Sequence, residues 1–364
     1  MSEYPAISEH GLIGDLQTAA LVSTDGTIDW FCSPRFDSPS IFGSLLDHEN
    51  GGHFSIRPQT TTFESKQLYL PDTAILITRF LTEQGVGEVI DYMPVTSDTP
   101  SARHRLVREL RCVRGSIVFD IEIAPRFDYG RQKHRVTVGE DSVTCIAGDT
   151  SLTFSLIRDP DTQRLGHAEL TDGGDLRFSL SLTEGQMRGV VLETGDAPAQ
   201  AVPVAEVERL FADTTRFWRD WIGQSTYTGR WREMVERSAI TLKLLTYAPT
   251  GGLVAAPTAG LPEQIGGERN WDYRYTWVRD ASFSVNTLLR LGFYDEAARL
   301  RPVATRSWRR TARQRDAPSQ HHVSHRRRPT SVRGDPRGLG RLPRVLPGAH
   351  RQRRRRPAPA RHLR

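Results

Sequence analysis

The residues best suited to chemistry in this 364-residue chain lie between Gln264 and Asp280, in the sequence QIGGERNWDYRYTWVRD. The last eleven of them hold four aromatic side chains, two arginines and the pair Arg279–Asp280. Flat aromatic rings pack against the C–H faces of a pyranose, and a guanidinium beside a carboxylate binds adjacent hydroxyl groups. The stretch therefore predicts a carbohydrate site. Composition alone equally allows a core segment in which Trp271 and Trp277 are buried and Arg279–Asp280 is an ion pair at a helix start.

Three ordered motifs, in two parts of the chain, give it a resemblance to a known family. Residues 266–282 read GGERNWDYRYTWVRDAS and follow LVAAPTAGLPE at Leu253–Glu263. Gly11–Gly43 read GLIGDLQTAALVSTDGTIDWFCSPRFDSPSIFG. The first two motifs resemble the start of the catalytic domain of glycoside hydrolase family 15, the glucoamylase and bacterial trehalase family. The third is similar to the trehalase-like N-terminal domain of its prokaryotic members, and the resemblance covers about residues 5–300.

The resemblance implies an inverting glycoside hydrolase that acts on α-linked glucose, in trehalose or in an α-glucan. In such an enzyme a carboxylic acid protonates the glycosidic oxygen, and a carboxylate across the sugar activates water. Carried over to this sequence, it implies that Tyr273 lies near the developing oxocarbenium ion and that Trp277 lines the first sugar subsite. It also implies that Arg279 and Asp280 hold ring hydroxyls. All four are expected to bind substrate; no catalytic residue is assigned to this chain, and no metal or cofactor is expected.

The chain before this stretch predicts an all-β sandwich over residues 1–200. Its apolar runs are rich in β-branched residues, alternate with polar residues, and show no helical period. Asp25–Gly26 predicts a tight hairpin, because glycine adopts the positive φ that such turns need. His53, Asp29 and Asp91 are expected to be structural rather than site residues. We expect this part to fold without the rest of the chain, with strands at residues 18–32, 73–81, 87–92, 116–123, 151–157 and 176–182.

After residue 203 the hydrophobic period changes from 2 to 3.6, which predicts helices. The resemblance implies that residues 231–300 form the start of an (α/α)6 toroid, after a linker helix within residues 201–230. The fold class is then α+β with two domains. Residues 253–262 are expected to form a loop. The expected helices are Val204–Ile222, Trp231–Tyr247, Ala281–Leu291 with Gly292 after its last turn, and one that begins at Tyr294.

Composition places the chain among soluble globular proteins, since 37% of its residues are hydrophobic and no apolar run is long enough to span a membrane. Residues 1–10 lack the basic start and apolar core of a signal peptide, so a cytoplasmic protein without a membrane partner is expected. Cys32, Cys112 and Cys145 lack metal-ligand spacing and are expected to be buried thiols. The oligomeric state is left open.

Residues 301–364 differ sharply in charge from the rest of the chain. They hold 20 arginines, two aspartates and neither lysine nor glutamate, so their net charge is +18. Because the net charge of the whole chain is +6, residues 1–300 carry a net charge of −12. Few apolar residues and many like charges predict a disordered tail. A basic arm that binds nucleic acid is one hypothesis. We prefer another, under which no nucleic-acid partner is expected: coding DNA read out of frame from about residue 300.

The genetic code allows this second hypothesis to be checked. Codons can be chosen for Pro336–Leu363 that, when read one nucleotide further on, encode LEGWEGYRGSYPVRIGNGAADQLQLDIY. This string resembles the next family motif. In the same shifted frame, codons permitted for Gln320–Arg327 allow SIMYRIDG, which is also family-like. By the resemblance, the general acid is the second Glu of WEGYRG, which falls across the codons of Gly340 and Arg341 and is not translated. The general base lies beyond Arg364. A truncated, non-catalytic form of a hydrolase is therefore expected, and the alternative is a carbohydrate- or partner-binding protein with a nucleic-acid-binding tail.

Overall fold

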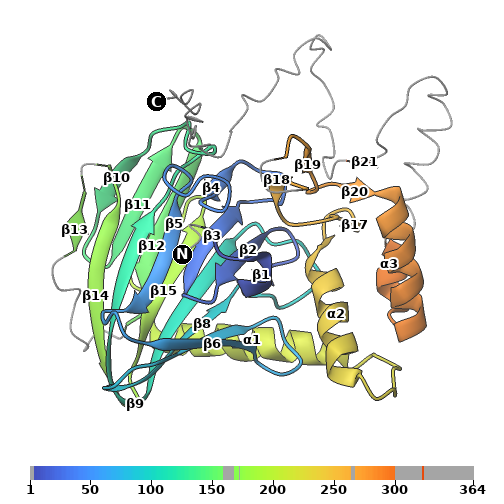
Figure 1. The fold of residues 1–364 in the computed structure, drawn as a ribbon, viewed down its shortest axis with the longest axis horizontal. Coiled ribbons are helices and arrows are strands. Elements are labelled where there is room, and N and C mark those ends of the chain that lie inside the picture. Colours follow the sequence, from blue (N-terminus) through green and yellow to red (C-terminus); the bar gives the residue numbers. More distant parts are fainter. Residues whose placement is uncertain (1–3, 159–167, 172, 264–266, 300–321, 324–364) are drawn as a thin grey trace, which may run out of the picture.

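The structure, a computed structural model, has a large β-sheet part followed by a few helices (Figure 1). It therefore has both components of the expected α+β class. The expected disordered tail, residues 301–364, lies outside the described residues except for His322–Val323. The described residues are 4–158, 168–171, 173–263, 267–299 and 322–323.

The β-sheet part consists of two layers that share the strand β9 (His104–Ala124), with antiparallel pairing throughout. The strands of the first layer are β1 (His10–Gly14), β2 (Ala19–Ser23), β3 (Thr27–Cys32), β4 (Ser40–Phe42), β5 (His53–Pro58), β13 (Glu169–Leu170) and β14 (Leu176–Thr183). Those of the second layer are β6 (Glu64–Tyr69), β7 (Leu76–Leu81), β8 (Gly85–Tyr92), β10 (Arg135–Val138), β11 (Ser142–Ala147), β12 (Thr150–Leu156) and β15 (Met187–Thr194). The predicted all-β N-terminal part is confirmed.

The strand prediction is correct for part of the sheet and misses the rest. The Asp25–Gly26 hairpin joins β2 to β3, and the other predicted runs overlap β7, β8, β9, β12 and β14. Strand β10 was missed because it is only four residues long. Strand β15 was missed because Val190–Leu192 are all buried, so its apolar residues do not alternate. The other missed strands are β1, β4, β5, β6, β11 and β13.

Strand β9 is 21 residues long and belongs to both layers. Its first half pairs with β8 and β15, and its second half pairs with β5 and β14. The two halves meet near Gly115, which has a φ of +71°. A Cβ atom there would collide with the carbonyl oxygen of Gln84. Glycine is therefore required at this position, both for the backbone conformation and for the lack of space.

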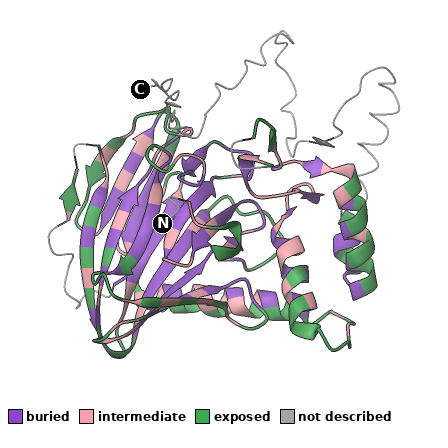
Figure 2. Cartoon of the chain, viewed as in Figure 1, coloured by how far each residue is buried: buried purple, intermediate pink, exposed green. Residues whose placement is uncertain are grey.

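The two layers enclose an apolar core, which appears as the buried interior of the strands in Figure 2. Phe54 of β5 contacts Phe154 of β12 edge to face, with 5.9 Å between ring centroids. Phe80 of β7 contacts Phe119 of β9 in the same way at 6.2 Å. Such ring pairs add roughly 0.5 to 1.5 kcal/mol each beyond the buried area. The core thus joins the two layers through contacts between their facing side chains.

A buried ion pair also joins the two layers. Arg108 Nε donates to Asp91 Oδ1 at 2.7 Å, and both side chains are fully buried. The guanidinium donates further to the carbonyl oxygens of Phe54 at 2.6 Å and Gly26 at 2.7 Å. Burial raises the pKa of Asp91 above its ordinary value, although Arg108 acts in the opposite direction. Arg108 therefore connects strands β8 and β9 to β5 and to the β2–β3 turn.

Helix α1 (Val204–Ile222) has the predicted bounds and packs against the second layer. Val207 is fully buried against side chains of that layer. The Tyr92 hydroxyl donates to the carbonyl oxygen of Val207 at 3.2 Å, and the Val95 amide donates to Thr214 Oγ1 at 3.3 Å. The helix is therefore an integral layer of the β-sheet part rather than a free linker.

A fragment that ends at residue 222 is expected to be more stable than one that ends at residue 200, by at least about 2 kcal/mol. Without α1, apolar side chains such as Tyr92, Val107 and Val191 lose their cover. Circular dichroism spectra and urea titrations of the two fragments measure the difference. Equal unfolding midpoints would contradict the role of α1. A helical or unfolded spectrum of the shorter fragment would contradict independent folding of the sandwich.

Helices α2 (Arg232–Leu244) and α3 (Val278–Leu291) pack with the end of α1 around a second apolar cluster. Trp221 of α1 stacks on Phe293, with 4.2 Å between ring centroids and 10° between ring planes. Residues 294–299 are helical again, as predicted. Across the described part of the chain, no helix has the length and apolar character needed to cross a membrane.

The second helix is shorter than predicted. The sequence predicts Trp231–Tyr247, but α2 ends at Leu244 because the next residues form β16 (Thr246–Tyr247). Strand β16 pairs with β17 (Gly252–Leu253), which reverses the chain direction.

The segment after it is also more regular than the loop predicted for residues 253–262. Strand β18 (Ala259–Pro262) pairs with β19 (Asn270–Asp272), and the pairing shifts register at an irregularity that the sequence pattern does not show. Helix α3 begins three residues before the predicted start and ends, as predicted, before Gly292, whose φ is +96°.

Candidate functional site

The stretch that contains the predicted site residues lies between the β-sheet part and α3 (Figure 1). Its first strand, β19, forms a hairpin with β18. Its second strand, β20 (Thr276–Trp277), pairs with β21 (His322–Val323) and leads directly into α3. The stretch thus consists of two short strands with a bend at Arg274 and Tyr275 between them, and it ends at a helix N-terminus.

Burial alternates along the stretch, so its two faces have different surroundings. Arg274 and Thr276 are buried, whereas Tyr273, Tyr275 and Trp277 are only partly buried. The buried and the partly buried side chains thus alternate across the bend at Arg274 and Tyr275. One face is therefore held in the protein, and the other face presents three aromatic rings.

The structure brings two of the predicted site residues together on this aromatic face. The rings of Tyr273 and Trp277 are 5.9 Å apart between centroids, with 31° between their planes. The Tyr273 hydroxyl lies 3.5 Å from Glu263 Oε1, at the limit of a hydrogen bond. Two partly exposed rings in this arrangement offer an apolar surface on which a sugar ring can pack.

The other two predicted residues occupy the first turn of α3. Arg279 Nη2 lies 3.2 Å from Asp280 Oδ2, and 73% of the Arg279 side chain is exposed. A carboxylate in the first turn is stabilised by the helix dipole. The ion pair of the core-segment hypothesis is therefore present, but Trp271 is exposed and Trp277 only partly buried, contrary to that hypothesis.

Arg274, which the sequence analysis did not single out, is the most connected residue of the stretch. Its Nε and Nη2 donate to the two carboxylate oxygens of Asp272 at 3.0 and 2.8 Å. Its Nη1 donates to the carbonyl oxygens of Ser38 at 2.7 Å and Phe36 at 3.1 Å, and lies 3.4 Å from Cys32 Sγ. Burial alone would lower the pKa of Arg274, but Asp272 and the other neighbours raise it above its ordinary value.

Backbone hydrogen bonds hold the same stretch against residues 255–257. The amides of Ala255 and Ala256 donate to the carbonyl oxygens of Tyr275 and Tyr273 at 3.1 and 3.0 Å. Trp30 of β3 donates from Nε1 to the carbonyl oxygen of Pro257 at 2.8 Å. The β-sheet part therefore contacts both the stretch and the segment behind it.

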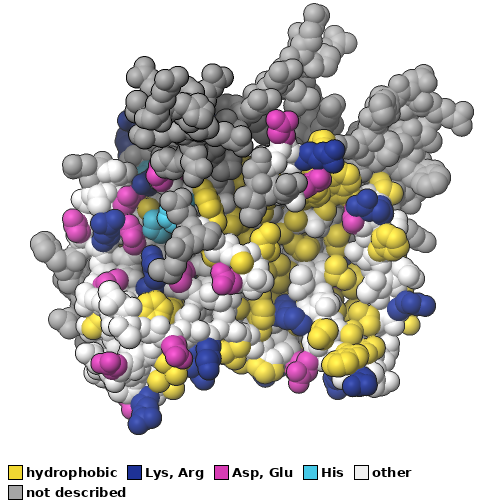
Figure 3. All heavy atoms as spheres, viewed as in Figure 1, with side chains coloured by type: hydrophobic (Ala, Val, Ile, Leu, Met, Phe, Trp, Pro, Cys, Tyr) yellow, Lys and Arg dark blue, Asp and Glu magenta, His cyan; other side chains and the backbone are white. Residues whose placement is uncertain are grey.

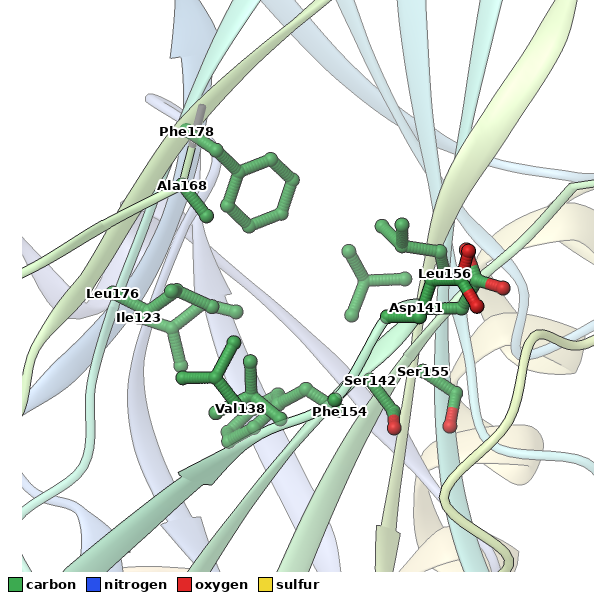
Figure 4. A pocket seen from close by; sticks show the side chains of 14 residues that line it. Ile123, Val138, Asp141, Ser142, Phe154, Ser155, Leu156, Ala168, Leu176 and Phe178 are labelled. Atoms are coloured by element: carbon green, nitrogen blue, oxygen red, sulfur yellow. The ribbon is translucent and has the colours of Figure 1, made fainter. Parts of the chain in front are cut away.

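Two hollows in the described structure lie elsewhere. The first, of about 230 Å³, lies between the layers and is lined mainly by apolar side chains of β9, β11, β12, β14 and β15 (Figure 4). The second, of about 330 Å³, is lined by Asp98, Thr99, Pro100, Ala248, Thr250, Gly251 and Arg299. None of the four predicted site residues lines either hollow.

Three polar residues expected to be structural each have a partner within the β-sheet part. Asp29 Oδ2 lies 2.6 Å from His10 Nε2, and His53 Nε2 lies 3.6 Å from Glu122. The third, Asp91, pairs with Arg108 as described above. Within the described ranges, no group of three or more His, Cys, Asp or Glu side chains could hold a metal ion.

The three cysteines are free and buried, as predicted. Burial raises the pKa of Cys32 to about 11 and that of Cys145 to about 12. Only about one thiol in a thousand is ionised three pH units below its pKa, and the thiolate is the reactive form. Ellman's reagent at pH 8 is therefore expected to label none of the three thiols in the native protein and all three in guanidinium chloride. Rapid labelling of the native protein would contradict the burial of these residues.

Comparison with known proteins gives two family matches. Residues 2–157 match the family described as "Trehalase-like, N-terminal", and residues 229–340 match "Glycosyl hydrolases family 15". The second match continues past residue 300, where the resemblance read from the motifs ends.

Relatives and a solved structure agree with these matches. The trehalase of Mycolicibacterium smegmatis is 36% identical over 319 residues, which cover 81% of this chain and 46% of that protein. The trehalase of Thermoplasma volcanium is 34% identical over 310 residues, with the same coverage. A bacterial glucoamylase, solved in complex with acarbose, shares the fold with a TM-score of 0.60 at 12% identity, over 87% of this chain and 52% of that chain.

The chain thus spans about half the length of the relatives it matches. The two family matches follow each other in the chain in the order that the N-terminal and central motifs predict. With the trehalase relatives, they show that residues 229–340 are similar to glycoside hydrolase family 15 and residues 2–157 to the trehalase-like N-terminal domain.

Proposed function

We propose that this chain carries the first sugar subsite of an inverting hydrolase of α-linked glucose, with trehalose or an α-glucan as substrate. The observation that carries the proposal is the Tyr273–Trp277 ring pair on the segment that leads into the Arg279–Asp280 ion pair. The trehalase relatives and the fold likeness to a glucoamylase solved with acarbose support this substrate class.

Each of the four residues has a role that its surroundings permit. The Trp277 ring packs on the face of the sugar, and the Tyr273 ring lies near the developing positive charge, which the electron-rich face of an aromatic ring attracts. Arg279 donates to ring hydroxyls and Asp280 accepts from them, and such charge-assisted hydrogen bonds are stronger than neutral ones. Specificity for glucose would follow from pairing each of these hydroxyls.

The two catalytic carboxyl groups of the proposed enzyme are not assigned to residues of this chain. An inverting mechanism needs an acid and a base roughly 6.5 to 9.5 Å apart, with a water molecule between the base and the sugar. The acid is proposed to be the Glu encoded out of frame across the codons of Gly340 and Arg341, and the base is proposed to follow Arg364. The 364-residue chain would then bind sugar without hydrolysing it.

We further propose that α2, α3 and the helix at residues 294–299 open an (α/α)6 toroid. Hydrophobic side chains gather on the surface of this helical part in Figure 3. Large exposed apolar patches mark surfaces that contact another element, and further helices of the toroid would cover this one. The exposed apolar residues of these helices and their flanks are Trp231, Met234, Phe283, Leu289 and Tyr294.

The nucleotide sequence around codon 300 and assays with trehalose and maltose test the proposal together. We expect the downstream frame to continue with family motifs. The 364-residue chain should release no glucose above background. A frame-restored protein, in which the reading frame near codon 300 is corrected and extended through the later family motifs, should release glucose with inverted anomeric configuration. NMR of the released glucose measures this configuration. Turnover by the 364-residue chain would contradict the placing of acid and base. A stop codon without a family-like frame would favour the binding-protein alternative.

A further inference from the structure

The buried face of the stretch is bound to the β-sheet part through one side chain. Arg274 is 5% exposed, and its Nε, Nη1 and Nη2 all donate hydrogen bonds. Two of these atoms bind Asp272 in its own stretch, and the third binds carbonyl oxygens of Phe36 and Ser38. The guanidinium also lies 6.0 Å from the ring centroid of Trp30 and 5.9 Å from that of Tyr129. Its position is therefore fixed from both sides.

We propose that Arg274 is a positioning residue, which holds the aromatic face of Tyr273 and Trp277 in place by anchoring the opposite face to the segment 32–38. The β-sheet part is then a structural component of the sugar site rather than a separate module. The inference rests on the proposed function for the identity of the ligand, a sugar. The anchoring of the stretch to residues 32–38 rests on the contacts of Arg274 alone.

Movement at Arg274 would reach the ring pair directly. Tyr273 is its neighbour in the chain, and the ring of Trp277 lies 5.9 Å from that of Tyr273 between centroids. The carbonyl oxygens of Tyr273 and Tyr275 accept the amides of Ala256 and Ala255, so a shift of the stretch would break these bonds as well. Binding surfaces work only when their supporting residues fix them to a fraction of an ångström, and a displacement of about 1 Å can cost about a hundredfold.

Lysine should not replace arginine at this position. A guanidinium is a planar fork that binds both oxygens of a carboxylate and still donates elsewhere, whereas an ammonium group is a compact charge on a flexible stem. Arg274→Lys keeps the charge beside Asp272 but cannot span Asp272, Phe36 and Ser38 together. If Arg274→Lys binds sugar no better than Arg274→Ala, the geometry of the guanidinium is required and its positive charge alone is not sufficient.

Arg237 offers a matched control. It lies on α2 and donates from Nη1 to the carbonyl oxygen of Thr73 at 2.8 Å, and its guanidinium lies 3.9 Å from the ring centroid of Tyr69. Like Arg274, it ties the helical part to a carbonyl and an aromatic ring of the β-sheet part. Arg237→Ala therefore removes a comparable contact without touching the stretch.

The test compares the unsubstituted chain with Arg274→Ala, Arg274→Lys, Asp272→Asn and Arg237→Ala. Binding of trehalose and of maltose is followed by tryptophan fluorescence, and amide hydrogen exchange is followed at Ala255 and Ala256. We expect Arg274→Ala and Arg274→Lys to weaken sugar binding about tenfold or more and to speed exchange at both amides. Asp272→Asn, the milder change, should act in the same direction, and Arg237→Ala should change neither readout.

The two readouts separate this inference from the proposed function. Unchanged affinity and unchanged exchange in the Arg274 variants would overturn the inference, as would equal effects of Arg237→Ala. If the unsubstituted chain binds neither sugar, the proposed function fails in this chain, and exchange alone decides. Faster exchange at Ala255 and Ala256 in Arg274→Lys or Asp272→Asn, but not in Arg237→Ala, then supports the anchoring role, and equal exchange overturns it. These two milder variants decide the matter if Arg274→Ala does not fold.

Discussion

Replacement of Arg108 by methionine is expected to lower the free energy of unfolding by about 3 to 5 kcal/mol, because it leaves a buried carboxyl group without its partner. Asp91 is fully buried, and burial already raises its pKa. The carbonyl oxygens of Phe54 and Gly26 would also each lose a charged donor, although that of Gly26 keeps the backbone amide of Ile56 at 3.2 Å. Urea titration of residues 1–222, followed by circular dichroism, measures the change.

Two further variants make this result interpretable. Arg57 forms an exposed pair with Asp25 at 3.4 Å, and Arg57→Met should cost only about 0 to 1 kcal/mol. The double variant Arg108→Met with Asp91→Leu should recover part of the loss, because no uncompensated charge remains in the core. A loss in Arg108→Met no larger than that in Arg57→Met would contradict the role given to the buried pair.

In a frame-restored protein, Arg279→Ala and Asp280→Ala are each expected to lower kcat/KM by an amount equivalent to about 2 to 4 kcal/mol. A charged hydrogen bond to a buried substrate hydroxyl would be lost, and its partner would be left unsatisfied. The structure predicts little change in stability, because Arg279 is mostly exposed and surface ion pairs contribute about 1 kcal/mol at most. Initial rates with trehalose and maltose, together with thermal melts, separate the two effects.

Arg290 provides the control for this pair of substitutions. It is exposed in the last turn of the same helix, so Arg290→Ala changes the charge of α3 away from the stretch. Its kcat/KM should match that of the unsubstituted protein. A restored enzyme that tolerates both Arg279→Ala and Asp280→Ala would remove the sugar-binding role proposed for these residues.

The sequence predicts those elements whose determinants are local. The bounds of α1 follow from apolar residues at helical spacing, and the end of α3 follows from Gly292, which adopts the left-handed conformation. The first half of β9 could not be predicted in this way. There Arg108 and Glu109 are buried among apolar residues, because both faces of the strand are covered. The burial of these residues therefore cannot be predicted from whether they are polar or apolar.

The same division applies to the candidate site. The spacing of Tyr273, Trp277, Arg279 and Asp280 suggests a sugar site, and the structure places the rings of Tyr273 and Trp277 5.9 Å apart between centroids. The spacing does not reveal that Arg274, which looks equally available, is buried. Besides Asp272, two residues away, its partners are carbonyl groups more than 200 residues earlier in the chain, and such backbone acceptors leave no trace in the sequence. Only the three-dimensional arrangement separates the anchoring arginine from the one proposed to bind sugar.

The sharing of β9 between both layers also bears on how the protein is made. This strand pairs with β5 and β8, which precede it, and with β14 and β15, which follow it. During synthesis, one edge of β9 therefore stays unpaired until residues 176–194 have left the ribosome. Unpaired strand edges template contacts with other chains, and non-local pairing is slow. We expect the newly made chain to depend on chaperones, or on slow translation, over the interval between β9 and β14.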